Sequence, residues 1–236
     1  MLTKMMGGGG GAAVTPATSV YTAEDFMSGS TDRHEYTSAP IGTADATRIV
    51  IVGIFLDDSS ETVPSSVTIG PYSASKIGTT NTLTDGAHEY SINFYGVAVP
   101  TGTIATIIVN YASGVIYTGM IVYALYNSTI TPTDQDNQSA LDLANESSLS
   151  HSITVPNNGT IIAVAQANDS SLSTDEINYT VLTEDVNLFD SGDDVLYSGA
   201  HLDYLTGADP QAFLFRNDSG PTINAIQSTA LSFPAA

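Results

Sequence analysis

Short runs of β-branched and aromatic residues recur along almost the whole chain, and they constrain its fold more than any other feature. Clusters of Gly, Asn, Asp, Pro and Ser separate the runs, and no helical periodicity lies between them. Val, Ile, Thr and Tyr favour strands, and turn residues at such intervals are typical of sandwiches and barrels. We predict strands over residues 48–56, 65–72, 89–99, 103–111, 115–125, 152–155, 160–167, 178–185, 195–205, 212–217 and 223–233.

A weak internal repeat suggests how these strands are organised. The segments LDDSS (56–60) and GAH (86–88) have counterparts ANDSS (167–171) and GAH (199–201), at nearly constant offsets. We therefore expect pseudo-repeats over about 48–126 and 159–233, with a polar connection over 127–150 that includes one short helical turn. Two Greek-key units of four strands would make a jelly roll. The predicted fold class is all-β: a jelly-roll-like antiparallel β-sandwich over 18–236, derived from a duplicated Greek-key unit.

The chain opens with MLTKMMGGGGGAAVTP, which we interpret as a flexible Gly-rich arm over residues 1–17. Five consecutive glycines cannot form the apolar helix of a signal peptide, and Leu2 stands where myristoylation needs glycine. Glycines allow one backbone to lie close against another, and methionines fit irregular grooves. We expect this arm to dock on a partner subunit through Met5, Met6, Gly7, Gly8, Gly9, Gly10 and Gly11.

The uncharged stretch 91–133 is the one candidate for a membrane span. Its Val, Ile, Thr and Tyr content favours strands over a spanning helix, and no Lys or Arg flanks it to set an orientation. Ser113-Gly114 is expected to be a hairpin turn between two of these strands. We predict no membrane insertion. The same apolar surplus suggests a face that associates with other copies of the chain.

The charge balance excludes several kinds of partner. The chain has 5 Lys and Arg against 25 Asp and Glu, a formal net charge of −20. Phosphate backbones and anionic membrane faces are recognised chiefly through Lys and Arg, so binding to nucleic acid is disfavoured. The chain has no cysteine, which excludes disulfides, Cys-ligated zinc, iron–sulfur clusters and a Cys nucleophile.

No motif indicates an enzyme or a cofactor. Zinc-protease, nucleophile-elbow, Walker and dinucleotide-binding patterns are absent from the sequence. Ser, His and Asp are abundant enough that a catalytic triad cannot be judged from sequence. His88 and His201 are interpreted as half-buried strand residues at equivalent repeat positions.

Calcium could bind where carboxylates crowd in loops. The weak candidates are Asp190, Asp193 and Asp194, and solvated acidic turns are the commoner outcome for such a cluster. Asp57-Asp58 and Asp134/Asp136 are two further carboxylate clusters. The segment that starts at Asp134 fails as a calcium loop, because Ser139 and Asn145 stand where glycine and glutamate are needed.

Four segments together resemble small β-sandwich proteins of tailed bacteriophage virions. They are ATRIVIVGIF (46–55), PSSVTIG (64–70), PTGTIATIIVNY (100–111) and SITVPNNGTIIAVAQA (152–167), preceded by the glycine-run start. The resemblance implies a non-enzymatic structural protein of the virion, an extracellular particle. Such proteins decorate the capsid or form part of a tail or fibre, contact other virion proteins and often assemble as homotrimers.

Two other functions stay open from the sequence. One is a glycan-binding, host-recognition module on the same fold, with tyrosines in place of the absent tryptophans. The other is a glycoside hydrolase, which would need two positioned carboxylates in a cleft.

Overall fold

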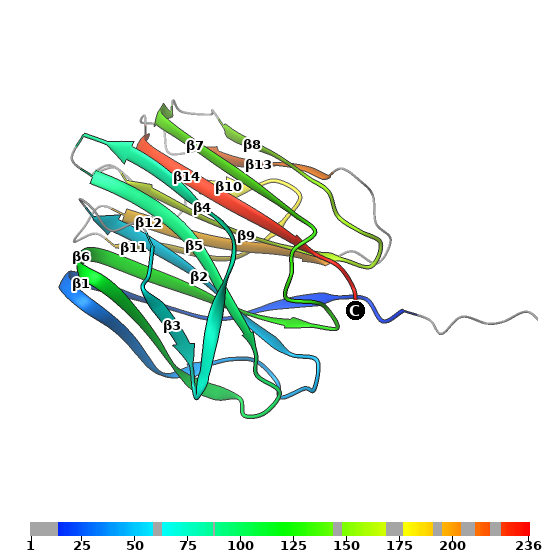
Figure 1. The fold of residues 1–236 in the computed structure, drawn as a ribbon. Helices are drawn as coiled ribbons and strands as arrows, with labels where there is room; N and C mark the ends of the chain where they lie inside the picture. Colours follow the sequence, from blue (N-terminus) through cyan, green and yellow to red (C-terminus); the bar gives the residue numbers. More distant parts are fainter. Residues whose placement is uncertain are drawn as a thin grey trace, which may run out of the picture.

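Fourteen antiparallel strands make up all the regular structure in the part of the chain that the computed structural model describes. That part comprises residues 14–58, 63–86, 88–143, 148–168, 177–190, 195–203, 211–217 and 223–236. The strands are β1 (Thr18–Pro40), β2 (Ile49–Asp58), β3 (Ser66–Ile69), β4 (Tyr72–Asp85), β5 (His88–Ala98), β6 (Ile104–Tyr126), β7 (Asp134–Leu143), β8 (Ser148–Ile153), β9 (Thr160–Asn168), β10 (Ile177–Tyr179), β11 (Thr183–Asp190), β12 (Val195–Asp203), β13 (Gln211–Asn217) and β14 (Ile223–Phe233). The prediction of an all-β, antiparallel sandwich is confirmed, whereas jelly-roll connectivity and a Greek-key origin stay predictions (Figure 1).

The first half of the chain forms one six-stranded sheet that closes on itself. Its order is β1-β6-β2-β5-β4-β3, and β3 also pairs with β6. Residues 107–110 of β6 pair with β3, while residues 117–125 pair with β2. Ser113-Gly114 lies where β6 passes from one partner to the other, so the predicted hairpin turn is wrong: the strand bends there without reversing.

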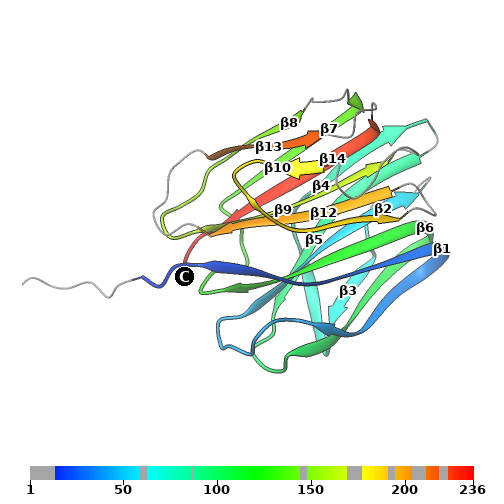
Figure 2. The ribbon, with the colours of Figure 1, turned by 180° about the vertical axis from the view of Figure 1, so that it is seen from behind.

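The second half of the chain forms two separate sheets. The five-stranded sheet has the order β11-β12-β9-β14-β7, and the three-stranded sheet has the order β10-β13-β8. Apolar residues of β9 and β14 fill the space between them, together with residues of β8 such as Leu149 and Ile153. In both views strands of the two sheets overlap, with β8 of the smaller sheet next to β7 of the larger one (Figures 1 and 2).

A third apolar layer joins the two halves. In β2, Val50, Val52 and Ile54 point into the closed first half, and the alternate residues point out of it toward β9, β12 and β14. Strands β5 and β6 are divided between two faces in the same way. The outward set includes Ile49, Ile51, Phe55, Ile92, Phe94, Ile121, Tyr123 and Leu125, which pack against Ile162, Val164, Val195, Tyr197, Leu231 and Phe233. The apolar stretch 91–133 is therefore covered within the chain: one set of its side chains lies in the interior of the first half, and the other set packs against the second half.

Three strands were missed by the sequence analysis, and all three are polar. Strand β7 and the start of β8 occupy the segment 127–150, which was predicted to be a connection with a helical turn; that prediction is wrong. Strands β1 and β4 were also missed. Each of the three lies at a sheet edge or toward solvent, where polar residues replace the apolar alternation that identifies buried strands.

The GAH matches do not mark equivalent positions. His88 begins β5 and is paired with Asp85 across the hairpin, whereas His201 lies near the end of β12 and is paired with Ile162 of β9. The prediction of equivalent positions is wrong, although both histidines do lie in strands.

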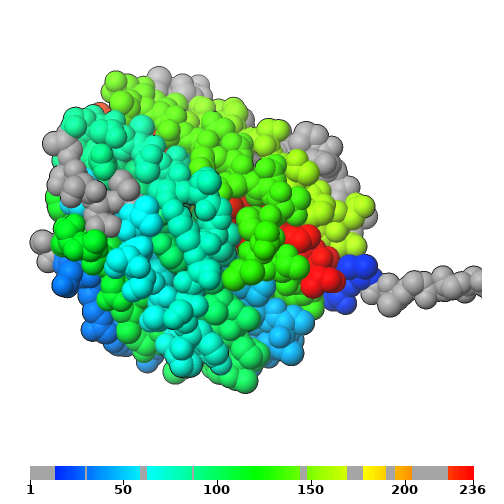
Figure 3. All heavy atoms as spheres, in the orientation of Figure 1, coloured from blue at the N-terminus to red at the C-terminus, as the bar shows by residue number. Residues whose placement is uncertain are grey.

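The two ends of the described chain lie close together. The N–H of the fully buried Ala17 donates to the carbonyl of Asn158 at 2.7 Å, and the N–H of Ala236 donates to the carbonyl of Asn127 at 2.8 Å. Figure 3 shows the C-terminal residues, in red, against the first described residues, in dark blue.

A buried arginine fixes the loops at this end of the first half. Arg48 is fully buried, and its guanidinium donates to four carbonyls: Val99 at 2.7 Å, Gly42 at 2.7 Å, Thr101 at 2.8 Å and Gly102 at 2.9 Å. A buried charge is tolerated when it is fully hydrogen-bonded, and these carbonyls supply the acceptors that the guanidinium needs. Arg48 thus holds two loops to the start of β2.

We expect Arg48→Met to destabilise the protein by about 3 kcal/mol or more, because four charged hydrogen bonds that hold two loops to β2 are lost, one of them to the buried carbonyl of Val99. For a chain of this size that is a fall in Tm of about 6–12 °C, measurable by calorimetry. Arg48→Lys should lose less, since an ammonium can still satisfy some of the carbonyls. Equal stability of Arg48→Met and wild type would contradict the role.

Candidate functional site

Each of the four histidines faces an aspartate, and these pairs are the best candidates for chemistry. The distances are 3.0 Å for His34 Nε2–Asp25 Oδ2, 2.9 Å for His88 Nδ1–Asp57 Oδ1, 3.5 Å for His151 Nδ1–Asp136 Oδ2 and 2.8 Å for His201 Nδ1–Asp185 Oδ1. A carboxylate beside an imidazole fixes its tautomer and orientation. His34 and His151 were not singled out from the sequence. Asp25 lies nine residues before His34 in the same strand, β1, and Asp136 lies in β7 while His151 lies in β8, so no short motif links either pair.

His201 belongs to a network that crosses the joint between the two halves. Tyr123 of β6 donates to Asp185 Oδ2 at 3.0 Å. The same carboxylate, on β11, is also hydrogen-bonded to His201 of β12. Tyr123 passes beside Gly199, where an added Cβ would lie 2.6 Å from the tyrosine oxygen. Burial keeps the pKa of Tyr123 well above its usual value, and the charge of Asp185 adds to this, so the phenol remains a donor. The network therefore ties a first-half side chain to a second-half hairpin.

The His201 pair also responds to pH. Its hydrogen bond with Asp185 raises the pKa of His201 above 6.5 against the opposing effect of burial, and the charges of Asp185 and Asp203 add to the rise. The protonated imidazole is therefore favoured in the folded protein.

Asp136, His151 and Ser228 have the order of groups found in serine hydrolases. His151 Nε2 makes a hydrogen-bond contact with Ser228 Oγ, and its Nδ1 faces the carboxylate of Asp136. Burial would raise the pKa of Asp136, but contacts with His151, the Ser152 N–H and Gln138 outweigh it and hold this pKa below its usual value. The groups come from β7, β8 and β14, so no local motif could have identified them.

A substrate cannot reach this triad, because its serine and its histidine are buried. Ser228 is 0% exposed and His151 is 2% exposed. Acyl transfer needs a nucleophile that a carbonyl carbon can approach and donors for the developing oxyanion. Ser228 and His151 instead connect the five-stranded sheet to the three-stranded sheet, and Asp136 accepts the backbone N–H of Ser152 at 2.7 Å. The arrangement satisfies buried polar groups and does not form a reaction site.

The carboxylate clusters give no metal site in the described residues. Asp134 and Asp136 lie in β7 and accept the N–H groups of Thr154 and Ser152. Asp57 and Asp58 are almost fully buried at the end of β2. No group of three or more His, Cys, Asp or Glu side chains that could hold a metal was found in the described ranges. Of the calcium candidates, Asp193, Asp194 and the side chain of Asp190 lie outside those ranges, as do Met5, Met6 and Gly7 to Gly11.

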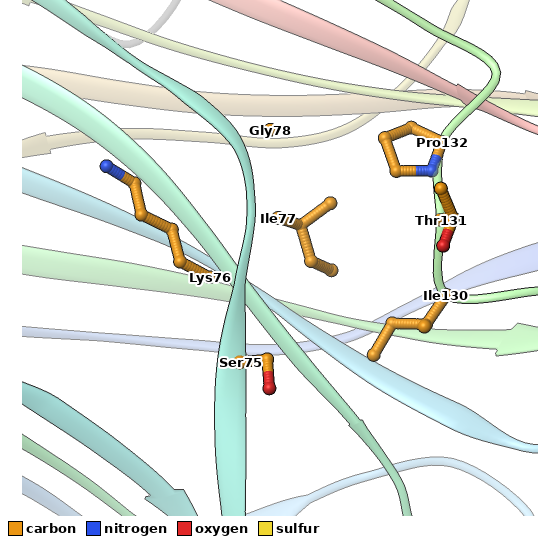
Figure 4. A pocket seen from close by; sticks show the side chains of 7 residues that line it. All are labelled: Ser75, Lys76, Ile77, Gly78, Ile130, Thr131 and Pro132. Atoms are coloured by element: carbon orange, nitrogen blue, oxygen red, sulfur yellow. The ribbon is translucent and has the colours of Figure 1, made fainter.

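A crevice of about 290 Å³ lies where the linker between the halves crosses β4. Its walls are Ser75, Lys76, Ile77, Gly78, Ile130, Thr131 and Pro132. Figure 4 shows the side chain of Ile77 directed toward Ile130 and Pro132, while Lys76 points away from them. Lys76 donates a hydrogen bond to Thr80, and the residues that line the crevice include no acid–base pair. The crevice is a joint between chain segments, without the groups that catalysis requires.

The chain matches no protein-family model, and no curated protein matches it significantly. No helix in the described residues has the length and apolar character needed to cross a membrane.

The His201–Asp185 pair predicts how stability depends on pH. Because the folded-state pKa of His201 is raised, the pair's contribution is complete below the unfolded value of about 6.5 and is lost as pH rises through the folded value. We expect His201→Gln to lower stability by about 1–2 kcal/mol at pH 5.5 and by less at pH 8.5.

Thermal unfolding at both pH values measures the effect. The double variant His201→Gln/Asp185→Asn should lose little more than the single variant, since both changes remove the contact between His201 and Asp185 and the amide oxygen at position 185 can still accept from Tyr123. A loss for His201→Gln that grows toward pH 8.5 would refute the assignment.

The burial of Ser228 predicts that the triad is inert. A fluorophosphonate probe should leave the native protein unlabelled, because the serine hydroxyl cannot reach the reagent. Intact-mass spectrometry beside an active serine hydrolase provides the measurement and its control. Labelling located at Ser228 and abolished by His151→Ala would show a working nucleophile.

Proposed function

We propose that this chain is a non-enzymatic structural protein of a bacteriophage virion, which decorates the capsid or forms part of a tail or fibre assembly. The proposal rests on the observation that the polar groups best suited to catalysis make contacts within the protein. The described histidines, their aspartates and Arg48 are engaged in contacts within or between the chain's own sheets. A protein built in this way serves as a rigid body with surfaces for assembly.

The distribution of charge supports the same proposal. Arg33 is paired with Glu35 at 2.6 Å, Arg48 is buried, and Lys76 bonds to Thr80. These are the described Lys and Arg side chains, so that part of the protein offers no basic patch to a nucleic acid. An excess of exposed acidic groups suits a protein that faces outward on a particle and stays dissolved.

The proposal that the particle is a phage virion comes from the resemblance of the sequence to phage β-sandwich proteins. Each half has eight strand segments when β1 and β6 are each counted as two, which is the number of strands in one jelly roll, so we propose this connectivity for each half and not for the two halves together. The proposal of a homotrimer rests on this resemblance alone, because the apolar stretch 91–133 is covered within the chain. Among large apolar side chains in that stretch, Ile104 is the one exposed.

The glycan-binding alternative receives no support from the described residues. It requires tyrosines presented in loops, and the described tyrosines are all buried or half-buried. A glycoside hydrolase requires two carboxylates facing a cleft, whereas Asp57, Asp136 and Asp185 face histidines.

The docking arm gives the test of this proposal. We expect deletion of residues 1–13 to leave Tm unchanged, because Ala17 and its hydrogen bond to Asn158 remain, and to remove the protein from phage particles purified on a density gradient. Replacing Gly7 to Gly11 with alanine should weaken incorporation, since alanine restricts close approach and positive φ.

Quantitative mass spectrometry of the particle fraction measures incorporation, with the full chain as control. Full incorporation of the truncated chain would show that the arm is not needed for docking. Absence of the full chain from every particle fraction would refute the virion role itself.

A further inference from the structure

The two halves of the chain have the same pattern of strand pairing, except that β3 pairs with β4 in the first half and no such pairing joins β10 to β11 in the described part of the second. The larger sheet is β1-β6-β2-β5-β4 in the first half and β7-β14-β9-β12-β11 in the second. The smaller set is β1-β6-β3 in the first half, formed by the far ends of β1 and β6, and β8-β13-β10 in the second. The long strands β1 and β6 thus each correspond to two strands of the second half. Counted in this way, both halves have eight strand segments in the same order.

The registers of the paired strands extend this correspondence to single residues. Ile49 is paired with Ala98 and Leu125, and Thr160 is paired with Asp203 and Phe233 in the corresponding strands. With Ile49 matched to Thr160, Ile51 corresponds to Ile162, Ile92 to Tyr197, Tyr123 to Leu231 and Leu125 to Phe233.

Corresponding residues are buried in the same interface. All four of the pairs just named, eight residues in total, belong to the apolar layer between the halves. The alternate residues obey the same rule: Val50 and Val52 lie in the interior of the first half, and their counterparts Ile161 and Ala163 lie in the interior of the second. Each half therefore presents the same face of the same sheet to the other. In oligomers, an interface made by the same patch on both partners is the isologous type of a two-fold dimer.

We propose that the joint between the halves is a self-recognising dimer interface, and that a half supplied on a separate chain binds its partner half through it. The layer has the anatomy of a stable interface, an apolar centre with polar contacts around it. At one side, Asp203 accepts from the Ser19 N–H at 2.8 Å, and the hydroxyls of Ser19 and Thr160 share a hydrogen bond of 2.8 Å. At the other, Asn81 Nδ2 donates to the carbonyls of Gln138 and Ser228, both at 3.0 Å.

Covalent connection contributes little to the geometry of this interface. The linker, residues 127–133, is short. Its Ser128 is buried and donates to the carbonyl of Pro234, and Ile130 packs against the apolar layer, whereas Thr131, on the crevice wall in Figure 4, is exposed. The linker acts mainly by raising the effective concentration of one half near the other. Cutting it should leave the apolar layer intact.

The test uses the full chain with a protease site inserted between Thr131 and Pro132. After cleavage of the folded protein, size-exclusion chromatography with light scattering should show one species containing both fragments in equal amounts. Fragments separated in denaturant and then mixed should return to that species. Elution of the cleaved fragments as two separate folded monomers would overturn the proposal, and so would failure of the mixed fragments to recombine.

Variants at corresponding positions test the equivalence of the two faces. Ile51→Asp and Ile162→Asp should each weaken association of the cleaved halves by about 100-fold or more, because each places an unpaired carboxylate in the apolar layer. Ile104→Asp, at an isoleucine that is 60% exposed, is the matched control and should leave association unchanged.

Alanine variants at the same two positions test the proposal even if the aspartate variants fail to fold. Ile51→Ala and Ile162→Ala should weaken association by similar factors while circular dichroism stays that of a β protein. Unchanged association in both alanine variants would overturn the proposal.

Discussion

Burial of one sheet face of each half against the other is the interaction on which this structure depends. Strands β2, β5 and β6 are apolar on both faces, and one of those faces can leave water only by contact with β9, β12 and β14. A fully buried aliphatic or aromatic side chain contributes about 1.5–3 kcal/mol, and the layer contains fifteen such residues. Neither half could expose this face without an apolar patch of the kind that drives association.

The polar groups follow from that apolar framework. Three stacked layers of core leave few places where a charged side chain can remain hydrated, so the buried polar groups need partners within the protein. At one end of the first half, loop carbonyls accept hydrogen bonds from Arg48. In the hairpin of β11 and β12, Asp185 is bonded to Tyr123 and His201. Along the edge of β8, backbone N–H groups donate to Asp134 and Asp136. Groups that would perform chemistry in an accessible cleft serve here as connections between sheets. This is why a Ser–His–Asp arrangement occurs without access for a substrate.

The sequence predicted the fold class and the buried strands, because strands such as β2 and β9 have continuous apolar runs. It did not predict β1, β4 and β7, whose polar residues face solvent or a neighbouring edge. The stretch 91–133 was interpreted as a surplus that other copies would cover, since sequence alone does not show that a second sheet of the same chain is the cover. The contacts of His151 with Ser228 join residues far apart in the chain, and such pairs depend on the register of several strands at once.

Native-state hydrogen exchange tests most directly whether the joint holds the whole protein together. The account predicts that amides of β2 and β6 in the first half and of β9 and β14 in the second share one opening free energy, equal to that of global unfolding, because neither half keeps its structure after the layer between them opens. Exchange of one half at a clearly lower free energy, while the other half stays protected, would contradict it.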